Sequence, residues 1–259
     1  MKRVVVIADL HCGHRAGLTP PEFQYDPENE EHIWQKFGLV QQLLWDFYTK
    51  IIESLKPVDL LIVNGDCVDG KGGKAGGTEQ ITADRKIQVD MAVKAIDFVS
   101  AKQIIMTYGT SYHTGDDEDW EDLVADKVGA KIGSHEWVDV NGCIFDIRHH
   151  VGRSAVPYGR LTAPLREQLW SYLWAEMAGY PKSDVIVRSH VHYHVDGQVF
   201  GKRAFTTPCL QLHTKYGSRR ATGTVDVGLL NFDVDDTGGY IWKAHLLELC
   251  KVAAHPLKV

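Results

Sequence analysis

The segment Leu60–Asp69, LLIVNGDCVD, places two carboxylates directly after a stretch with the character of a β-strand. The stretch is β-branched and apolar and is bounded by Gly65, as in a buried strand of a parallel or mixed sheet. Asp66 and Asp69 then stand at the carboxyl end of that strand, where open α/β sheets bind ligands. Taken alone, the segment is equally compatible with an ordinary strand followed by a polar turn.

Four further predicted strands end in the same way. Each is followed by aspartate or histidine: Asp9 and His11 after Val4–Ala8, His113 after Gln103–Tyr108, His149 and His150 after the second strand of a hairpin over Glu136–His149 that turns at Asn141-Gly142, and His190 and His192 after Asp184–Arg188. Alternation along an extended backbone places Asp9 and His11 on the same side. The same argument puts His149 on the face of the buried strand residues and His150 on the other face, unless a bulge exchanges the two.

Helical periodicity separates these strands and predicts an α/β fold. Amphipathic helices are expected at Glu30–Leu55, Thr78–Ser100, Asp116–Val128 and Leu161–Ala178. Strands are expected in the C-terminal part at Val195–Phe200, Arg203–Gln211, Thr224–Val234 and Tyr240–Leu249. No repeat or linker composition divides the chain, so one domain over residues 1–259 with two sheets is the simplest architecture.

Composition excludes several classes of protein. The chain has 259 residues, of which 44% are hydrophobic and 24% are charged, as in globular proteins. The net charge of −6 argues against a generally basic nucleic-acid binder. Because the five cysteines are scattered and form no CxxC pair, we expect neither a disulfide framework nor a structural zinc site, and we expect a reducing, cytoplasmic setting. The N-terminal apolar run is too short for a secretory signal, and we expect no membrane-spanning segment.

The mixture of ligand types at the strand ends predicts a transition-metal site. Imidazole and carboxylate together favour manganese, iron, zinc or cobalt over calcium or magnesium. There are more candidate ligands than one tetrahedral ion needs, which implies two ions and one carboxylate that bridges them. Asp66, the central carboxylate, is the expected bridge.

The series D-x-H, GD-x-x-D, G-x-x-x-H, a strand-terminal His and [GS]-H-x-H resembles the calcineurin-like metallophosphoesterase family over nearly the whole chain. The resemblance implies a four-layer sandwich of two mixed β-sheets flanked by helices. It also implies these roles: Asp9, His11 and His192 on one ion, Asp66 bridging, His149 and His190 on the other ion, and Asp69 supporting the ligands from behind.

The chain departs from the family pattern at the third motif. Where the family has GNHD, this chain has Gly109-Thr110-Ser111-Tyr112-His113, so the usual Asn ligand is absent. Thr110, Ser111 or a water could take its place. If the loop bulges, His113 can still reach the position of the family's catalytic histidine, with Asp116 or Asp117 orienting it.

These features together predict a dinuclear-metal-dependent hydrolase of phosphate esters, of the phosphodiesterase or phosphatase type. Two ions about 3.5–4 Å apart generate a bridging hydroxide that attacks the phosphoryl group without a covalent enzyme intermediate. His113 would protonate the leaving oxygen. Manganese is the preferred metal, with iron, zinc or cobalt as alternatives.

Two rival functions are compatible with the same sequence features. One is a nuclease of the same family acting on DNA, with the backbone held by basic residues: Arg148, Arg153, Arg160, Arg166 and the loop Lys215–Arg220 with Arg219 and Arg220. These residues could equally be solvated charges on an acidic protein. The other rival is a metal-binding protein of this fold without turnover. The natural substrate, the native metal and the oligomeric state are not determined by the sequence.

Overall fold

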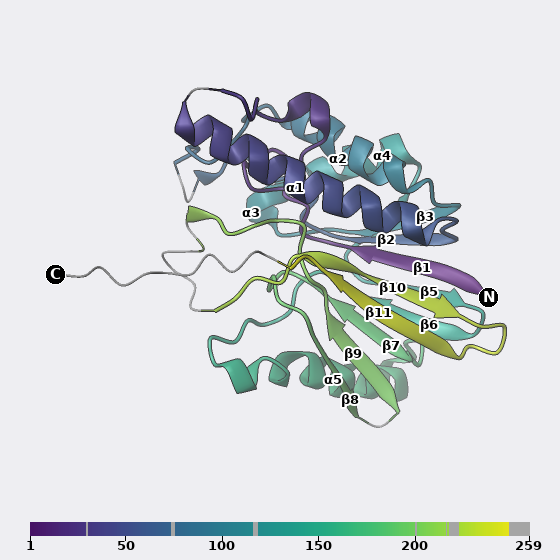
Figure 1. Cartoon of the computed structure of the whole chain (residues 1–259). Helices are drawn as coiled ribbons and strands as arrows, with labels where there is room; N and C mark the ends of the chain where they lie inside the picture. The colour runs from purple at the N-terminus through teal and green to yellow at the C-terminus, as the bar shows by residue number, and fades with distance from the viewer. Residues whose placement is uncertain are drawn as a thin grey trace.

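Two β-sheets pack face to face between layers of helices, as Figure 1 shows. The structure is a computed structural model, and it describes residues 1–29, 31–73, 76–115, 119–199, 201–215, 217 and 223–248. All structural statements below refer to these residues.

The first sheet is mixed and has six strands in the described part of the chain. Their order across the sheet is β11 (Tyr240–Leu246), β10 (Gly228–Val234), β1 (Lys2–Ile7), β2 (Leu60–Asn64), β3 (Gln103–Thr107) and β4 (Lys131–Gly133). Strands β1 to β4 run parallel, while β10 is antiparallel to both β1 and β11. The carboxyl ends of β1, β2 and β3 therefore meet at one edge of the sheet.

The second sheet is also mixed and has five described strands. Their order is β5 (Glu136–Val140), β6 (Cys143–Ile147), β7 (Val185–Arg188), β9 (Lys202–Thr206) and β8 (Val195–Val199). Strands β6, β7 and β9 are parallel, and β5 and β8 are antiparallel to their neighbours. The expected hairpin is confirmed, because β5 and β6 are joined at Asn141-Gly142, where both residues have positive φ.

Helices cover both outer faces of the sandwich. They are α1 (His32–Leu55), α2 (Arg85–Val99), α3 (Ser111–Thr114), α4 (Trp120–Val128) and α5 (Thr162–Ala178), with 3-10 turns η1 (Pro21–Phe23) and η3 (Pro157–Gly159). Helices α1, α2 and α4 lie over the first sheet and α5 lies over the second (Figure 1). The predicted α/β sandwich of two mixed sheets flanked by helices is confirmed, whereas the single domain over residues 1–259 remains a prediction.

Alternating side chains of the first sheet build two separate cores. Val4, Val6 and Ile62 face the second sheet, where they join a cluster with Phe145 and Phe232. The residues between them, including Val5, Ile7, Leu61 and Val63, face the helices. Strands β1 and β2 are thus buried on both faces, which explains why their sequences are continuously apolar rather than alternating.

Helix α2 begins seven residues later than the sequence predicts. Asp84 caps it, since its carboxylate accepts a hydrogen bond of 2.9 Å from the Lys86 backbone N–H. The preceding residues are used elsewhere: segment 79–81 hydrogen-bonds to segment 13–15, with Ile81 N donating to Gly13 O at 2.7 Å. Tertiary pairing of this loop therefore replaces the first turns of the predicted helix.

The amphipathic pattern of α5 predicts its buried face only in part. Of the apolar residues expected to face inward, Leu165, Leu173 and Trp174 are half-buried, but Leu169 is 52% exposed, and the buried positions include Glu167 and Gln168. The reason lies in the sheet beneath, where Arg188 is completely buried and needs acidic partners: Asp146 at 2.8 Å and Glu167 at 3.0 Å. Burying a cation without such partners would cost several kcal/mol, so the helix turns its glutamate inward.

No helix in the described ranges is long and apolar enough to cross a membrane.

The strands at the end of the chain are shorter than predicted, and β10 begins at Gly228 rather than Thr224.

Candidate metal centre

The loop after β1 carries Asp9 and His11 in a backbone conformation that the sequence did not indicate. Both residues have left-handed φ angles, 52° and 46°, so the expectation of extended backbone between them is wrong. Asp66, His190 and His192 are also left-handed, with φ of 53°, 72° and 57°. Such angles are uncommon for residues with a side chain, and they gather at functional sites, where surrounding structure holds them. Five of the six predicted metal ligands share this feature.

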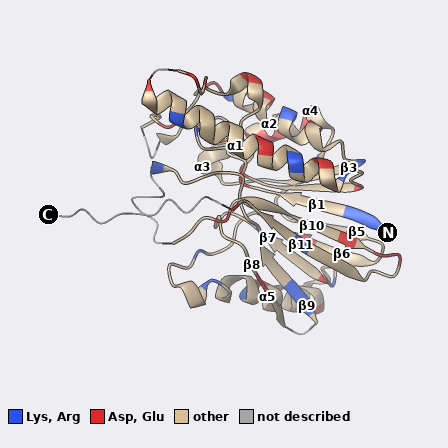
Figure 2. Ribbon diagram, in the orientation of Figure 1, with Lys and Arg blue, Asp and Glu red and all other residues tan. Residues whose placement is uncertain are grey.

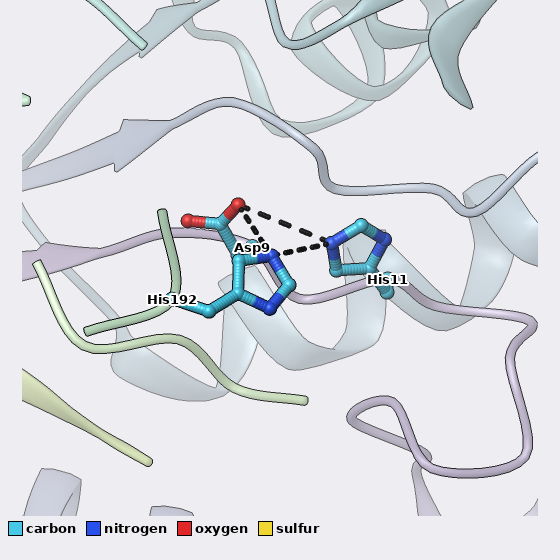
Figure 3. Close-up of side chains that lie close together, drawn as sticks. All are labelled: Asp9, His11 and His192. Carbon is cyan, nitrogen blue, oxygen red and sulfur yellow. Dashed lines mark hydrogen bonds and ion pairs between the residues drawn. The ribbon is translucent and has the colours of Figure 1, made fainter. Parts of the chain in front are cut away.

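Asp9, His11 and His192 converge on one point, as Figure 3 shows. The Asp9 Oδ1 atom lies 3.1 Å from His192 Nε2 and 3.9 Å from His11 Nε2, and the two Nε2 atoms are 3.3 Å apart. The other carboxylate oxygen of Asp9 is engaged, because it accepts a hydrogen bond from the His190 backbone N–H at 3.2 Å. One oxygen and two ring nitrogens thus face a common centre.

Asp66, His149 and His190 form a second group, which brings together residues from both sheets. His149 Nδ1 donates to the backbone carbonyl of Asn64 at 2.7 Å, so in the neutral ring the lone pair is on Nε2, which lies 3.1 Å from Asp66 Oδ2. A histidine held in this way is oriented for metal ligation. His149 belongs to this group, whereas His150 is exposed and does not.

Buried polar atoms in both groups fit a bound cation. Asp9 Oδ1 and His149 Nε2 are buried and make no hydrogen bond. Burial disfavours the charged form of His149, yet the nearby Asp66 and Asp9 carboxylates raise its pKa to about 10. Burial and the neighbouring His149 lower the pKa of His190 to about 4. The carboxylates thus attract positive charge, and a divalent ion would supply it while leaving the imidazoles neutral, as ligation requires.

Asp69 supports this centre from behind. It is buried, and its Oδ1 atom accepts a hydrogen bond of 2.8 Å from His11 Nδ1, which leaves His11 Nε2 free to face the centre. Gln80 Nε2 donates to the other oxygen of Asp69. Burial by itself would raise the pKa of Asp69, but hydrogen bonds from His11 and His113 hold that pKa well below its usual range.

The short helix α3 carries His113 to the site. Its Nδ1 atom lies 3.0 Å from the backbone carbonyl of Asp69, and its ring packs edge-on against His11 with 4.6 Å between centroids. Burial by itself would lower the pKa of His113, but the hydrogen bond to Asp69 outweighs it, and the pKa is raised. Asp116 and Asp117, proposed from the sequence to orient His113, lie outside the described residues.

Thr110 takes the place in sequence of the missing Asn. Its backbone N–H donates to Asp66 Oδ1 at 2.6 Å, and its hydroxyl lies 2.9 Å from Asp66 Oδ2. Ser111, the other candidate, is exposed. Thr110 therefore stabilises the charged carboxylate of Asp66.

Glu121 is a supporting residue that sequence reasoning missed. It is completely buried, and its two oxygens accept hydrogen bonds of 2.6 Å from the backbone N–H groups of Cys67 and Gly109. It thereby ties together the loops after β2 and β3. The only signal in the sequence was an acidic residue in the first turn of a predicted helix, which the helix dipole explains equally well.

A cavity of about 330 Å³ opens on these groups. Its lining includes the candidate site residues His11, Asp66, His113, His190 and His192, together with Tyr112, Arg153 and His213. The volume is that of a small-ligand site, large enough for a phosphoryl group with part of its alcohol.

The arginines considered for nucleic-acid binding have separate surroundings. Arg148 pairs with Glu167 at 2.5 Å, Arg160 donates to Thr224 at 3.2 Å, and Arg153 lines the cavity. Figure 2 shows basic and acidic positions interspersed along α1 rather than separated. Arg219 and Arg220 lie outside the described residues, so the nucleic-acid interpretation stays untested.

Comparison with known proteins gives structural similarity only. No family model matches the chain, and no curated protein matches it. Similar solved structures include a novel archaeal phosphodiesterase, with 13% identity, a TM-score of 0.47 and coverage of 94% of this chain and 99% of the other. Vps29 from Entamoeba histolytica complexed with zinc has 12% identity, a TM-score of 0.42 and coverage of 94% and 98%. A predicted phosphoesterase from Streptococcus pneumoniae has 9% identity, a TM-score of 0.40 and coverage of 94% and 98%. The resemblance to calcineurin-like metallophosphoesterases thus continues to depend on the sequence motifs.

Proposed function

We propose that the protein hydrolyses phosphate esters with two bound divalent transition-metal ions, manganese being the preferred metal. The observation that carries the proposal is the convergence of Asp9, His11 and His192 beside Asp66, His149 and His190, with Asp9 Oδ1 and His149 Nε2 buried and without hydrogen bonds. Buried polar atoms without partners are costly, and coordination of a cation removes that cost.

The residues divide between the two ions as the motifs suggest. Asp9, His11 and His192 would hold one ion, His149 and His190 the other, and Asp66 would bridge them. Such ions activate water at neutral pH and neutralise the charge of phosphoryl oxygens. The protein's own contribution is orientation: Asp69 and the Asn64 carbonyl fix the rings of His11 and His149 so that Nε2 of each points inward.

His113 would act on the leaving group. The Nδ1 atom of His113 is hydrogen-bonded to the backbone carbonyl of Asp69, which holds the ring in place. Nε2 is therefore the atom that can hold a proton for the departing alkoxide. His113→Ala should lower kcat by about 10²–10⁴-fold with both ions bound. The loss should be greater for alkyl esters than for activated aryl esters, and equal losses on both would leave His113 without this role.

A chelation experiment tests the proposal. The purified protein is assayed on an aryl phosphodiester and an aryl phosphomonoester with Mn²⁺, then after chelation, and again after Mn²⁺ is restored. Hydrolysis that disappears and returns with the metal supports an enzyme. Two bound metal equivalents without turnover would support the rival, a metal-binding protein of this fold.

The cellular setting remains a prediction. The described part of the chain has four cysteines, and all are buried and outside any disulfide: Cys12, Cys67, Cys143 and Cys209. This agrees with a reducing compartment such as the cytoplasm but does not assign one.

A further inference from the structure

Two loop segments outside the metal groups pair with each other and contribute to the wall of the same cavity. Segment 13–15 is hydrogen-bonded to segment 79–81, with Arg15 N donating to Glu79 O at 2.9 Å and Ile81 N donating to Gly13 O at 2.7 Å. Both His14 and Glu79 line the cavity that holds His11 and Asp66. Neither residue has a role in the proposed metal chemistry.

The hydrogen bonds of His14 determine which of its ring nitrogens carries the proton. The Ala16 backbone N–H donates to His14 Nδ1 at 3.0 Å. Because a backbone N–H can only donate, Nδ1 must be the unprotonated nitrogen, and Nε2 of the neutral ring carries the hydrogen. This arrangement is opposite to that of His11 and His149, in which Nδ1 is the donor. His14 Nε2 is therefore a hydrogen-bond donor and not a metal ligand.

Glu79 offers the complementary acceptor. Its Oε1 atom accepts a hydrogen bond of 2.7 Å from the Lys215 backbone N–H, while its Oε2 atom lies 4.0 Å from His14 Nε2. That separation is too long for a hydrogen bond. The side chains are only 7% and 10% exposed. A nearly buried donor and a nearly buried carboxylate oxygen thus face the cavity without bonding to each other.

Few chemical groups satisfy both atoms at once. A phosphate oxygen would be repelled by the Glu79 carboxylate, and an ammonium group cannot accept from His14. A hydroxyl group can accept from His14 Nε2 and donate to Glu79 Oε2 through its single oxygen.

We propose that His14 and Glu79 bind a hydroxyl group on the alcohol portion of the phosphate ester, so that the natural substrate is an ester of a polyol. The proposal rests on the proposed function, since the same cavity would hold the phosphoryl group at the metal ions. A ribose or a glycerol unit could supply the hydroxyl, and the two sources are separated by the ligands used in the test.

The test measures the affinity of the Mn²⁺-loaded protein for two matched ligand pairs by calorimetry. One pair is 3′-deoxy-3′-(phosphonomethyl)adenosine and its 2′-deoxy counterpart, in which a C–P bond replaces the ester bond so that the loaded protein cannot hydrolyse them. The other is 3,4-dihydroxybutylphosphonate and butylphosphonate, whose C–P bond resists hydrolysis. The wild type should prefer the hydroxyl-bearing member of one pair by about 10-fold, the effect expected of a hydrogen bond to a charged group. The pair that shows the preference identifies the source.

Two variants and a control assign the preference to these residues. Glu79→Gln removes the charge, and His14→Asn keeps an acceptor for the Ala16 N–H but removes Nε2. Each should reduce the preference to less than about 3-fold. Glu176→Gln, a change to an exposed glutamate, should leave it intact. If Glu79→Gln fails to fold, His14→Asn still decides.

Failure of this inference can be told apart from failure of the proposed function. If the wild type shows no preference in either pair, or both variants keep the preference, the hydroxyl site is wrong. Hydrolysis of bis(4-nitrophenyl) phosphate, which has no hydroxyl group, is measured in parallel on the wild type and on Glu176→Gln, and the two rates should be similar. That activity reports on the metal chemistry alone.

Discussion

Asp69→Asn tests how the metal centre is supported, because the structure allows the charge to be removed with little change in geometry. Asp69 Oδ1 accepts from His11 Nδ1, and Oδ2 accepts from Gln80 Nε2. In the variant the new amide oxygen can still accept from His11, while the amide nitrogen faces Gln80. Gln80 Oε1 is buried without a hydrogen bond, so a flip of this side-chain amide would supply an acceptor.

The expected magnitude follows from the type of hydrogen bond. A bond to a charged group contributes about 1.5–3 kcal/mol and a neutral bond about 0.5–1.5 kcal/mol, so the loss is about 1–1.5 kcal/mol. That difference corresponds to about 10-fold weaker binding of the ion held by His11. Asp69→Ala removes the acceptor altogether and should weaken this ion by up to about 100-fold, the upper range for residues that orient metal ligands.

Calorimetric titration of the metal-free protein with Mn²⁺ provides the assay. One equivalent should weaken in the order wild type, Asp69→Asn, Asp69→Ala, while the equivalent held by His149 should change little. Asp126→Asn, at an exposed position of α4, serves as the matched control. Wild-type affinity for both equivalents in Asp69→Ala would refute the reasoning, since His11 would then need no orienting carboxylate.

The other predictions concern the ligands and the buried charges. Asp66→Asn should release both metal equivalents and abolish activity. Cys67→Ser should keep both equivalents, since Cys67 packs in the apolar core. Elemental analysis showing two ions retained in the Asp66 variant would disprove the bridging role of Asp66. His149→Ala should lose one equivalent and His150→Ala none, and the same analysis would reverse the assignment if the exposed residue were the one required. Burial by itself would raise the pKa of Asp146, but the ion pair with Arg188 lowers that pKa to about 2. Because the folded-state pKa lies below the unfolded value, its stabilisation is present above pH 4 and is lost as the pH falls towards 2. The stability advantage over Asp146→Asn should therefore shrink by about 2 kcal/mol across that window in denaturant titrations, and a constant difference would contradict the shift.

The sequence by itself determined the sheets and the location of the candidate centre. Buried parallel strands must be apolar on both faces, so Val4–Ala8 and Leu60–Asn64 could be recognised as strands, and the hairpin at Asn141-Gly142 could be recognised from its turn residues. Since parallel strands end at a common edge, polar residues after each strand had to lie near one another. The proximity of Asp9 to Asp66 follows from this rule, whereas their meeting with the histidines that follow β6 and β7 depends on how the two sheets pack against each other.

Tertiary structure alone decided how each side chain is aimed. The left-handed backbone at Asp9 and His11 is fixed by hydrogen bonds to the neighbouring loop, such as the one from His11 N to Asp66 O at 2.9 Å. Hydrogen bonds between distant segments also pair residues 13–15 with residues 79–81. This pairing shortens α2 and brings Glu79 beside His14. The face of α5 likewise depends on a buried arginine in another element. These outcomes depend on contacts between residues distant in the chain, which the spacing of residues along one segment cannot encode.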